Sequence, residues 1–177
     1  VVGGGNSAID AARTALRLGA DKVTILYRRT RQEMPANAEE IEAAEHEGVE
    51  FHFLAAPLKA IADDNGVLKR IEVQKMELGE PDSSGRRRPV PIEGETETME
   101  VDTLVPAIGQ RHDLACGEGM EDIQVSSKGW IEAHSVTLQT SKPGVFAGGD
   151  FFTGPALVVE AVAAGQEAAI SIDRYLR

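Results

Sequence analysis

The first residues of the chain have the spacing of a turn that binds the pyrophosphate of a dinucleotide. Gly3, Gly5 and Ala8 fit the pattern G-x-G-x-x-[G/A]. In this pattern the first glycine permits a tight turn from strand to helix, and the second lets the backbone approach a pyrophosphate. The third small residue lets the helix pack closely on the strand. The alternative interpretation is a glycine turn that only packs a helix against a sheet.

The residues after the glycines are expected to form a helix whose N-terminus would face the phosphates. Ile9, Ala12 and Leu16 recur on one face of this helix, and Asn6 or Ser7 is expected to cap its start. Unpaired N–H groups and the helix dipole favour negative charge at such an end. The candidate cofactor-binding residues of the turn are therefore Gly3, Gly4, Gly5, Asn6, Ser7 and Ala8.

The next expected strand, residues 22–27, ends in a basic segment. Arg28, Arg29 and Arg31 follow it, and the first carboxylate after the strand is that of Glu33. NAD sites usually place a carboxylate ~20 residues after the glycines, where it accepts from the ribose 2′-hydroxyl. A 2′-phosphate would be repelled by a carboxylate and is bound well by guanidinium groups. The segment therefore favours NADP(H), with Arg28 and Arg29 as candidates that spacing alone does not separate; a solvated basic loop is the alternative.

The middle of the chain is expected to supply one short helix and further strands. Residues 34–37 interrupt the strand pattern, and an acidic helix is expected over 38–47. Strands are expected over residues 49–55, 68–78 and 98–107. The chain thus begins with a strand, a glycine turn, a helix and a second strand, and these elements follow. This order predicts an α/β fold.

Two segments beside these strands could contact a ligand or a partner. The polar segment 79–89 is expected to be an exposed hairpin tip, although its arginines, residues 86–88, would alternatively bind an anion or a partner. The later strand ends at Ile108 and Gly109. Because open α/β sheets bind ligands at the carboxyl edge of their strands, Ile108 and Gly109 are further candidates for cofactor binding.

A second strand, turn and helix pattern lies near the end of the chain. An expected strand over residues 143–147 stops at Gly148, Gly149 and Asp150, and a helix is expected from Pro155 to about Tyr175. Because the helix is nearly apolar at first, we expect it to be buried. Asp150 can accept from a ligand hydroxyl, or alternatively it only caps the turn. The candidates here are Gly149, Asp150, Pro155 and Ala156.

Composition and charge exclude several classes of protein. The 177 residues contain 18 Lys and Arg against 29 Asp and Glu, a net charge of −11, which argues against general binding to nucleic acid or an anionic membrane. No apolar run approaches the ~20 residues that span a bilayer. The single cysteine, Cys116, excludes an internal disulfide and a cysteine metal cluster, and the four histidines lack metal-ligand spacing. We expect a cytoplasmic domain without a metal, in a chain that begins inside a strand.

Four motifs together resemble one family. Residues 3–10, 26–36, 106–110 and 144–150 are similar, in the same order, to motifs of the NADPH-dependent glutamate synthase small (β) subunit and its relatives. These proteins are flavoprotein oxidoreductases with two dinucleotide-binding domains. The resemblance implies a Rossmann-like, three-layer NADP(H)-binding domain at residues 1–110, with its first strand truncated. It also implies that residues 111–177 are the C-terminal part of an FAD-binding domain.

The resemblance also implies a function. In this family NADPH passes hydride to FAD, and electrons continue to iron–sulfur clusters or to a partner subunit. Gly149 and Asp150 would meet the flavin's ribityl and pyrophosphate region, and the helix at Pro155 would point toward its ring. The cofactors carry this chemistry, so no catalytic residue is nominated.

The chain departs from the family pattern in two places. It lacks the family's first FAD motif and its cysteine-rich region, and so resembles a C-terminal fragment that is inactive alone. The implied partners are the missing N-terminal FAD and iron–sulfur part and a large electron-accepting subunit. A nucleotide-binding module without catalysis is the alternative. A disulfide reductase of the thioredoxin reductase type would need a cysteine pair, which this sequence lacks.

Overall fold

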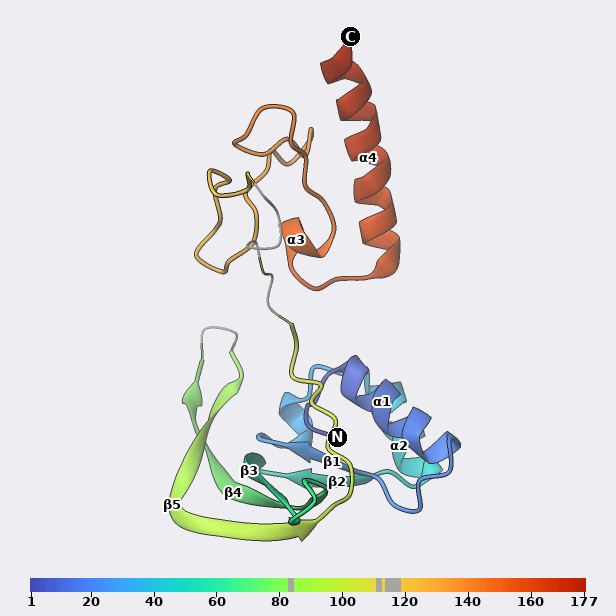
Figure 1. The fold of residues 1–177 in the computed structure, drawn as a ribbon, viewed down its shortest axis with the longest axis vertical. Helices are drawn as coiled ribbons and strands as arrows, with labels where there is room; N and C mark the ends of the chain where they lie inside the picture. The colour runs from blue at the N-terminus through green and yellow to red at the C-terminus, as the bar shows by residue number, and fades with distance from the viewer. Residues whose placement is uncertain (83–84, 111–112, 114–118) are drawn as a thin grey trace. The chain divides into compact units, whose positions relative to one another are not determined.

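The chain forms two compact units, Val1–Gly109 and Gln110–Arg177 (Figure 1). The computed structural model describes residues 1–82, 85–110, 113 and 119–177. The assignment of the first unit to NADP(H) and of the second to FAD stays a prediction.

A parallel sheet with two helices forms one part of the first unit. The helices are α1, Asn6–Arg17, and α2, Ala38–Glu47, and the strands are β1, Thr24–Tyr27, and β2, Glu50–Phe53. β1 and β2 are parallel, with Ile25 opposite Phe51. The expected order of glycine turn, helix, strand, helix and strand is therefore present.

Val2 joins β1 to the segment that ends the first unit. It forms parallel bridges with Leu26 on one side and Pro106 on the other. The Val2 N–H donates to the Val105 carbonyl at 2.9 Å, and the Ala107 N–H donates to the Val2 carbonyl at 2.7 Å. The strand expected over residues 98–107 is wrong in extent, because the observed strand ends at Glu100 and residues 101–107 contribute only the bridge at Pro106.

An antiparallel sheet forms the other part of the first unit. Its strands, in the order β3–β4–β5, are β3, Ala55–Ala62, β4, Leu68–Pro81, and β5, Arg87–Glu100. The strand expected over residues 49–55 divides at Leu54, whose φ of 54° breaks the extended conformation between β2 and β3. β4 and β5 pair as the expected hairpin, but the connection is shorter than residues 79–89, because β4 extends to Pro81 and β5 begins at Arg87.

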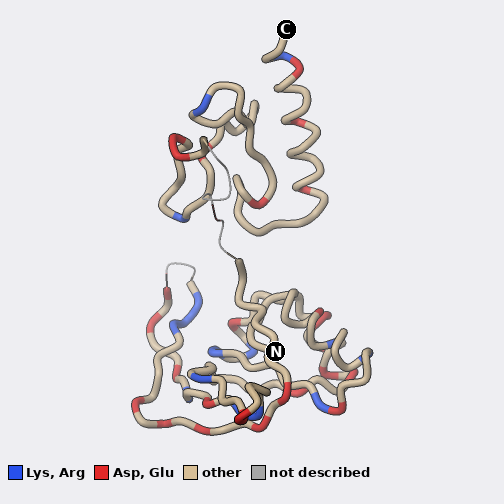
Figure 2. The backbone as a smooth tube through the Cα atoms, viewed as in Figure 1, with Lys and Arg blue, Asp and Glu red and all other residues tan. Residues whose placement is uncertain are grey.

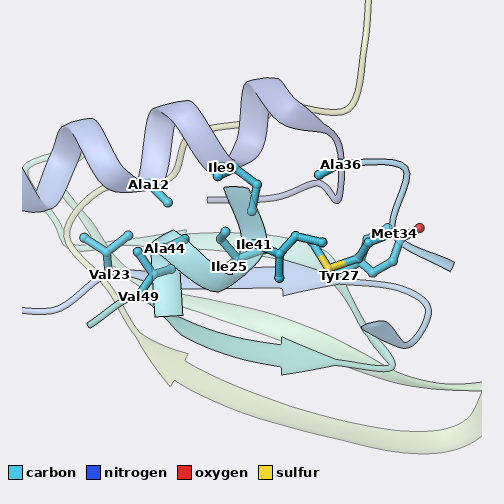
Figure 3. Close-up of a cluster of buried hydrophobic side chains, with 10 residues drawn as sticks. All are labelled: Ile9, Ala12, Val23, Ile25, Tyr27, Met34, Ala36, Ile41, Ala44 and Val49. Atoms are coloured by element: carbon cyan, nitrogen blue, oxygen red, sulfur yellow. The ribbon is translucent and has the colours of Figure 1, made fainter. Parts of the chain in front are cut away.

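The parallel sheet lies between two apolar layers. On one face, Ile9 of α1, Ile25 of β1 and Ile41 of α2 belong to one buried cluster (Figure 3). On the other face, Leu26 of β1 packs with Val73 of β4 in a second cluster. Alternate residues of β1 thus face the helices and the antiparallel sheet, as strand geometry requires. The expected three-layer α/β architecture is confirmed.

The second unit consists of bridged loops and two helices. The helices are α3, Asp150–Thr153, and α4, Val158–Leu176. The strand expected over residues 143–147 is reduced to one bridge, between Gln139 and Phe146. The prediction that the last helix begins at Pro155 is wrong by three residues. The Glu160 carboxylate accepts from the Leu157 N–H at 2.8 Å, which fixes the helix start after Leu157.

The expected burial of the last helix is also wrong within the described residues. No residue of α4 is buried, and Val158 is 81% exposed. The helix packs mainly through small side chains. A Cβ atom at Gly148 would lie 2.9 Å from the Ala164 Cβ, and one at Gly149 would lie 3.3 Å from the Ala161 Cβ. The apolar composition of α4 predicted burial, but the described residues contact mainly its small-residue face and the Tyr175 ring.

The described residues contain neither a membrane-spanning helix nor a cluster of metal ligands. None of the helices there is long and apolar enough to cross a membrane. Within the same residues, no three His, Cys, Asp or Glu side chains gather in a group that could hold a metal ion.

Candidate functional site

The first two glycines of the turn are required by the protein itself. Gly3 has a φ of +143°, and a Cβ atom there would lie 2.3 Å from the Ala107 carbonyl oxygen. A Cβ atom at Gly4 would lie 2.4 Å from the Tyr27 ring. Both distances are far inside van der Waals contact. These glycines therefore let the turn pack against the residue 107 backbone and the end of β1.

Gly5 differs, because nothing in the protein requires glycine there. It is the N-cap of α1, with φ −91° and ψ 175°, an extended conformation that any residue adopts. The atom nearest to a Cβ at this position would be Cγ of Pro35, at 4.0 Å. The space over Gly5 is thus open at the N-terminus of a helix. This is the arrangement in which a dinucleotide pyrophosphate approaches the backbone.

The start of α1 is not capped by a side chain, so the prediction that Asn6 or Ser7 caps it is wrong. The N-cap is Gly5, and the Asn6 side chain instead accepts from the Asn37 N–H at 2.9 Å. Asn6 and Ser7 are exposed, whereas Ala8 is fully buried beneath the turn. The first amides of α1 are thereby left for an anionic ligand.

Residues 33–37, which we call the strap, close one side of the glycine turn. The Ala36 N–H donates to the Gly4 carbonyl at 3.2 Å, next to the bond between Asn37 and Asn6. The Tyr27 hydroxyl donates to the Glu33 carbonyl at 2.8 Å. From the sequence, residues 34–37 were expected only to interrupt the strand pattern. The available signal was the Met-Pro-Ala segment within the family motif.

The first carboxylate after β1 is that of Glu33, and it is hydrogen-bonded within its own loop. Glu33 accepts from the Thr30 hydroxyl at 2.5 Å and from the Thr30 N–H at 3.1 Å. The Thr30 hydroxyl bond is the main cause that lowers the pKa of the Glu33 carboxyl below its ordinary value. Glu33 is buried, and its ionised oxygen is already bonded. It is therefore poorly suited to accept a ribose hydroxyl as the carboxylate of an NAD site does.

The two candidate arginines lie in different environments. Arg28 is exposed, and in the described part of the chain its guanidinium has no ion-pair or hydrogen-bond partner. Arg29 is 6% exposed, and its Nη2 lies 2.8 Å from Oδ2 of Asp82. The nearby Arg31 forms an ion pair with Glu45 of α2. Figure 2 shows the basic residues at the end of β1 and on the returning arm of the hairpin.

Ile108 and Gly109 lie at the same edge of the first unit as the glycine turn. Ala107, directly before them, bonds to Val2, and its carbonyl oxygen touches the position of Gly3. Ile108 is 75% exposed, and Gly109 has a φ of +96°. Because they follow Ala107 directly, Ile108 and Gly109 lie near the glycine turn. Their contact with a cofactor stays a prediction.

The second unit has a hollow at the other candidate site. It has a volume of about 460 Å³ and is lined by residues 148–151 and by one face of α4, including Ala161 and Ala164. Asp150 is exposed, and its Oδ1 accepts from the Ala156 N–H at 3.2 Å. This bond ties Asp150 to the segment that holds Pro155 and Ala156. Gly149, Asp150 and Ala156 thus line one hollow, whereas Pro155 lies beside it in the chain.

Gly154 and Trp130 form a close contact that the sequence analysis missed. Gly154 has a φ of +81°, and a Cβ atom there would lie 2.3 Å from the Trp130 ring. The Ile131 N–H donates to the Phe151 carbonyl at 2.8 Å. Residues 130–131 therefore support the loop between α3 and α4. No spacing rule links residues 130 and 154, so the sequence offered no signal for this contact.

Similarity to known proteins agrees with this arrangement. The profile of the pyridine nucleotide-disulphide oxidoreductase family matches residues 1–165. The β subunit of an NADP(+)-dependent formate dehydrogenase from Moorella thermoacetica is 54% identical over 177 residues, which are all of this chain and 25% of that protein. The small chain of glutamate synthase [NADPH] from Escherichia coli is 38% identical over 99% of this chain and 38% of its own length. The similarity to this group is confirmed, and the chain spans less than half of either relative.

Solved structures show the same fold. Thioredoxin reductase from Lactococcus lactis has a TM-score of 0.76 and 21% identity, covering 99% of this chain and 51% of its own. FprA from Mycobacterium tuberculosis, in complex with NADPH, has a TM-score of 0.71 and 17% identity, covering 99% and 52%. At these identities the likeness concerns the fold alone.

Proposed function

Because the chain belongs to the pyridine nucleotide-disulphide oxidoreductase family, we propose that its first unit, Val1–Gly109, binds NADP(H). The observation that carries this proposal is the open space at Gly5. Packing within the protein requires glycine at positions 3 and 4, whereas at Gly5 the atom nearest to a Cβ position is Cγ of Pro35, at 4.0 Å, which leaves room for a ligand. A pyrophosphate at this place would accept from the first amides of α1 and gain from the helix dipole.

The end of β1 supports the choice of NADP(H) over NAD(H). Arg28 supplies an exposed guanidinium there, and Glu33 has its carboxylate bonded to Thr30. A cationic group without a competing carboxylate is what a ribose 2′-phosphate needs. The names of two relatives agree with this choice, because one is a subunit of an NADP(+)-dependent formate dehydrogenase and the other is the small chain of glutamate synthase [NADPH].

For the second unit, Gln110–Arg177, we propose a contribution to an FAD site. The hollow beside Gly149 and Asp150 offers room for part of such a group, because glycine and alanine make up much of its lining, together with Phe151, Leu157 and Val158. Asp150 accepts from the Ala156 N–H through one carboxylate oxygen, and both residues line the hollow. Gly149, Asp150 and Ala156 would hold the cofactor there, and Pro155 would shape the loop.

In the complete protein these sites would belong to an NADPH-dependent flavin oxidoreductase. When bound, the two cofactors supply hydride and electron transfer chemistry, which needs no acid or base from the protein. The residues of this chain would bind and orient the nucleotide: the glycine turn would hold its pyrophosphate and Arg28 its 2′-phosphate, while the strap keeps the turn in place. The onward acceptor would be iron–sulfur clusters or a partner subunit, as the resemblance to the glutamate synthase small subunit implies.

Anaerobic stopped-flow spectroscopy of the full-length protein tests this function. Mixing with NADPH is expected to bleach the flavin absorbance, and mixing with NADH at the same concentration is expected to bleach it much more slowly. The alternative, a nucleotide-binding module without catalysis, predicts binding of NADPH but no bleaching. Equal rates with both nucleotides would contradict the assignment of a 2′-phosphate site.

A further inference from the structure

The hairpin between β4 and β5 is fastened to the end of β1 through Arg29. The Arg29 Nη2 lies 2.8 Å from Oδ2 of Asp82, before the hairpin turn, and its Nε donates to the Arg87 carbonyl at 2.7 Å, after the turn. One buried guanidinium therefore bonds both arms of the hairpin. Forked donors of this kind fix geometry in a way that a lysine cannot.

Asp82 is itself held in place by the turn that it opens. Its N–H donates to the Arg86 carbonyl at 2.8 Å, and its own carbonyl accepts from the Gly85 N–H at 2.9 Å. The Arg29 carbonyl likewise accepts from the Leu54 N–H at 3.1 Å. Hydrogen bonds thus hold the backbone of both Asp82 and Arg29 in place. A swing of Arg29 toward a ligand would break its two hydrogen bonds, to the Asp82 carboxylate and to the Arg87 carbonyl.

The charge of Arg29 is largely cancelled where it lies. A carboxylate at 2.8 Å offsets the guanidinium charge, so a phosphate nearby would meet a nearly neutral pair. Arg28, one residue earlier, is exposed, and the structure records no acidic partner for it among the described residues. The adjacent arginines therefore present one cation to solvent, although the sequence contains two.

We propose that Arg28 determines the preference for NADPH and that Asp82 is a positioning residue, which holds Arg29 out of the nucleotide site and anchors the hairpin beside it. This inference rests on the NADP(H) function proposed above. It adds that Arg29 is a structural anchor and that the β4–β5 hairpin is part of the architecture of the nucleotide site.

Two matched variants of the full-length protein test the assignment by calorimetric titration with NADPH and NADH. Arg28→Met removes the exposed cation. The double variant Arg29→Met/Asp82→Asn removes both charges of the buried pair and keeps the net charge. The readout is the ratio of the Kd for NADH to the Kd for NADPH, which a purely structural loss of affinity does not change. The affinity for NADH reports whether the glycine turn is intact in each variant.

The ratio is expected to fall about ten- to a hundredfold in Arg28→Met, as the loss of charge-assisted hydrogen bonds to a phosphate implies. In the double variant it is expected to stay within about threefold of the wild-type ratio, because the removed pair is neutral. A ratio that falls in the double variant, or one that persists in Arg28→Met, would overturn the inference. If the wild type itself shows no preference for NADPH, the proposed function fails instead.

If the double variant is too unstable to assay, Asp82→Asn alone answers the same question. It removes the partner of Arg29, leaves Arg28 unchanged and adds no volume. The ratio is then expected to be kept or raised, because one negative charge near the site is gone. A fall in the ratio would show that Arg29, in the position that Asp82 gives it, contributes to phosphate binding, and would contradict the role assigned to Asp82.

Discussion

Gly4 and Gly5 differ in what a Cβ atom would meet. At Gly4 it would lie 2.4 Å from the Tyr27 ring, and at Gly5 the nearest atom is Cγ of Pro35, at 4.0 Å. The packing of the protein therefore requires glycine at position 4, whereas glycine at position 5 leaves room for a ligand. A substitution at Gly4 acts on stability, and one at Gly5 acts on binding.

Gly4→Ala is expected to lower the free energy of unfolding by about 1–3 kcal/mol, the cost of overpacking a buried contact. Gly5→Ala is expected to change it by less than about 1 kcal/mol, because its backbone conformation is ordinary. Gly5→Ala should nevertheless weaken NADPH binding by about tenfold, equivalent to about 1.4 kcal/mol. Denaturant unfolding and calorimetry check both variants. Unchanged NADPH affinity in Gly5→Ala would show that no ligand approaches there.

Asn6 joins the strap to the glycine turn through its side-chain oxygen, which accepts from the Asn37 N–H at 2.9 Å. Asn6→Ala removes this acceptor and is expected to weaken NADPH and NADH alike, by about fivefold for one lost hydrogen bond. Asn6→Asp keeps an acceptor and suits the helix start, so its Tm is expected to match or exceed that of the wild type. It should still bind both nucleotides more weakly than the wild type, because its charge repels phosphate. Wild-type affinity in Asn6→Asp would contradict a pyrophosphate at this position.

At the scale of elements, α1 and α2 are joined by a cluster of ion pairs. Oε1 of Glu47, at the end of α2, lies 2.7 Å from Nη2 of Arg13 and 2.5 Å from Nη2 of Arg17, both on α1. The bonds to Arg13 and then Arg17 lower the pKa of the Glu47 carboxyl from 4.5 to about 2. The contact fixes how the two helices lie on the parallel sheet, and so how α1 presents its N-terminus.

This cluster makes stability depend on pH in a defined window. Because the pKa of Glu47 is lower in the folded chain, ionised Glu47 stabilises the fold above about pH 4.5 and its contribution is lost as the pH falls toward 2. Glu47→Gln is therefore expected to lower Tm at pH 7, with a difference from wild type that shrinks toward zero at pH 2. Circular dichroism melts at several pH values measure this. Glu42→Gln, on the same helix, is the control, and a difference independent of pH would contradict the assignment.

Local signals predicted the elements around the glycine turn well. The helix expected over residues 38–47 has those bounds in the structure, because Gly48, with a φ of +99°, ends it. Structural features that depend on contacts between residues distant in the sequence were not predicted. No periodicity of the sequence indicates that the strand expected over residues 49–55 divides at Leu54. The bond between Arg29 and Asp82 joins two residues that are far apart in the sequence. The strap was missed for the same reason, since its hydrogen bonds connect residues about thirty positions apart.

At the scale of the whole molecule, each of the two units carries one glycine-based candidate site. The first unit has the turn at residues 3–8, and the second has the hollow beside Gly149. The exposed apolar face of α4 shows where reasoning from composition failed. Apolar content predicted burial of the helix, but burial is decided by which residues cover it, and those described here cover only part.

The single tryptophan, Trp130, gives the second unit its own spectroscopic probe. Gly154→Ala is expected to displace the Trp130 ring, because its Cβ would lie 2.3 Å from it at a φ of +81°. We expect a shifted emission maximum and a loss of about 1–3 kcal/mol of stability in this unit. Gly165→Ala, in α4, meets no atom within 4 Å and is the matched control, expected to be neutral or stabilising. Unchanged emission in Gly154→Ala would contradict the packing described.

Calorimetric titration of the protein with NADPH and then with NADH, in the same buffer, tests the central claim most directly. An open pyrophosphate site at Gly5 beside an exposed Arg28 predicts that NADPH binds about tenfold or more tightly than NADH, as expected for charge-assisted bonds to a 2′-phosphate. Equal affinities would contradict the reading of the basic segment after β1. Failure of both nucleotides to bind would contradict the assignment of the glycine turn itself.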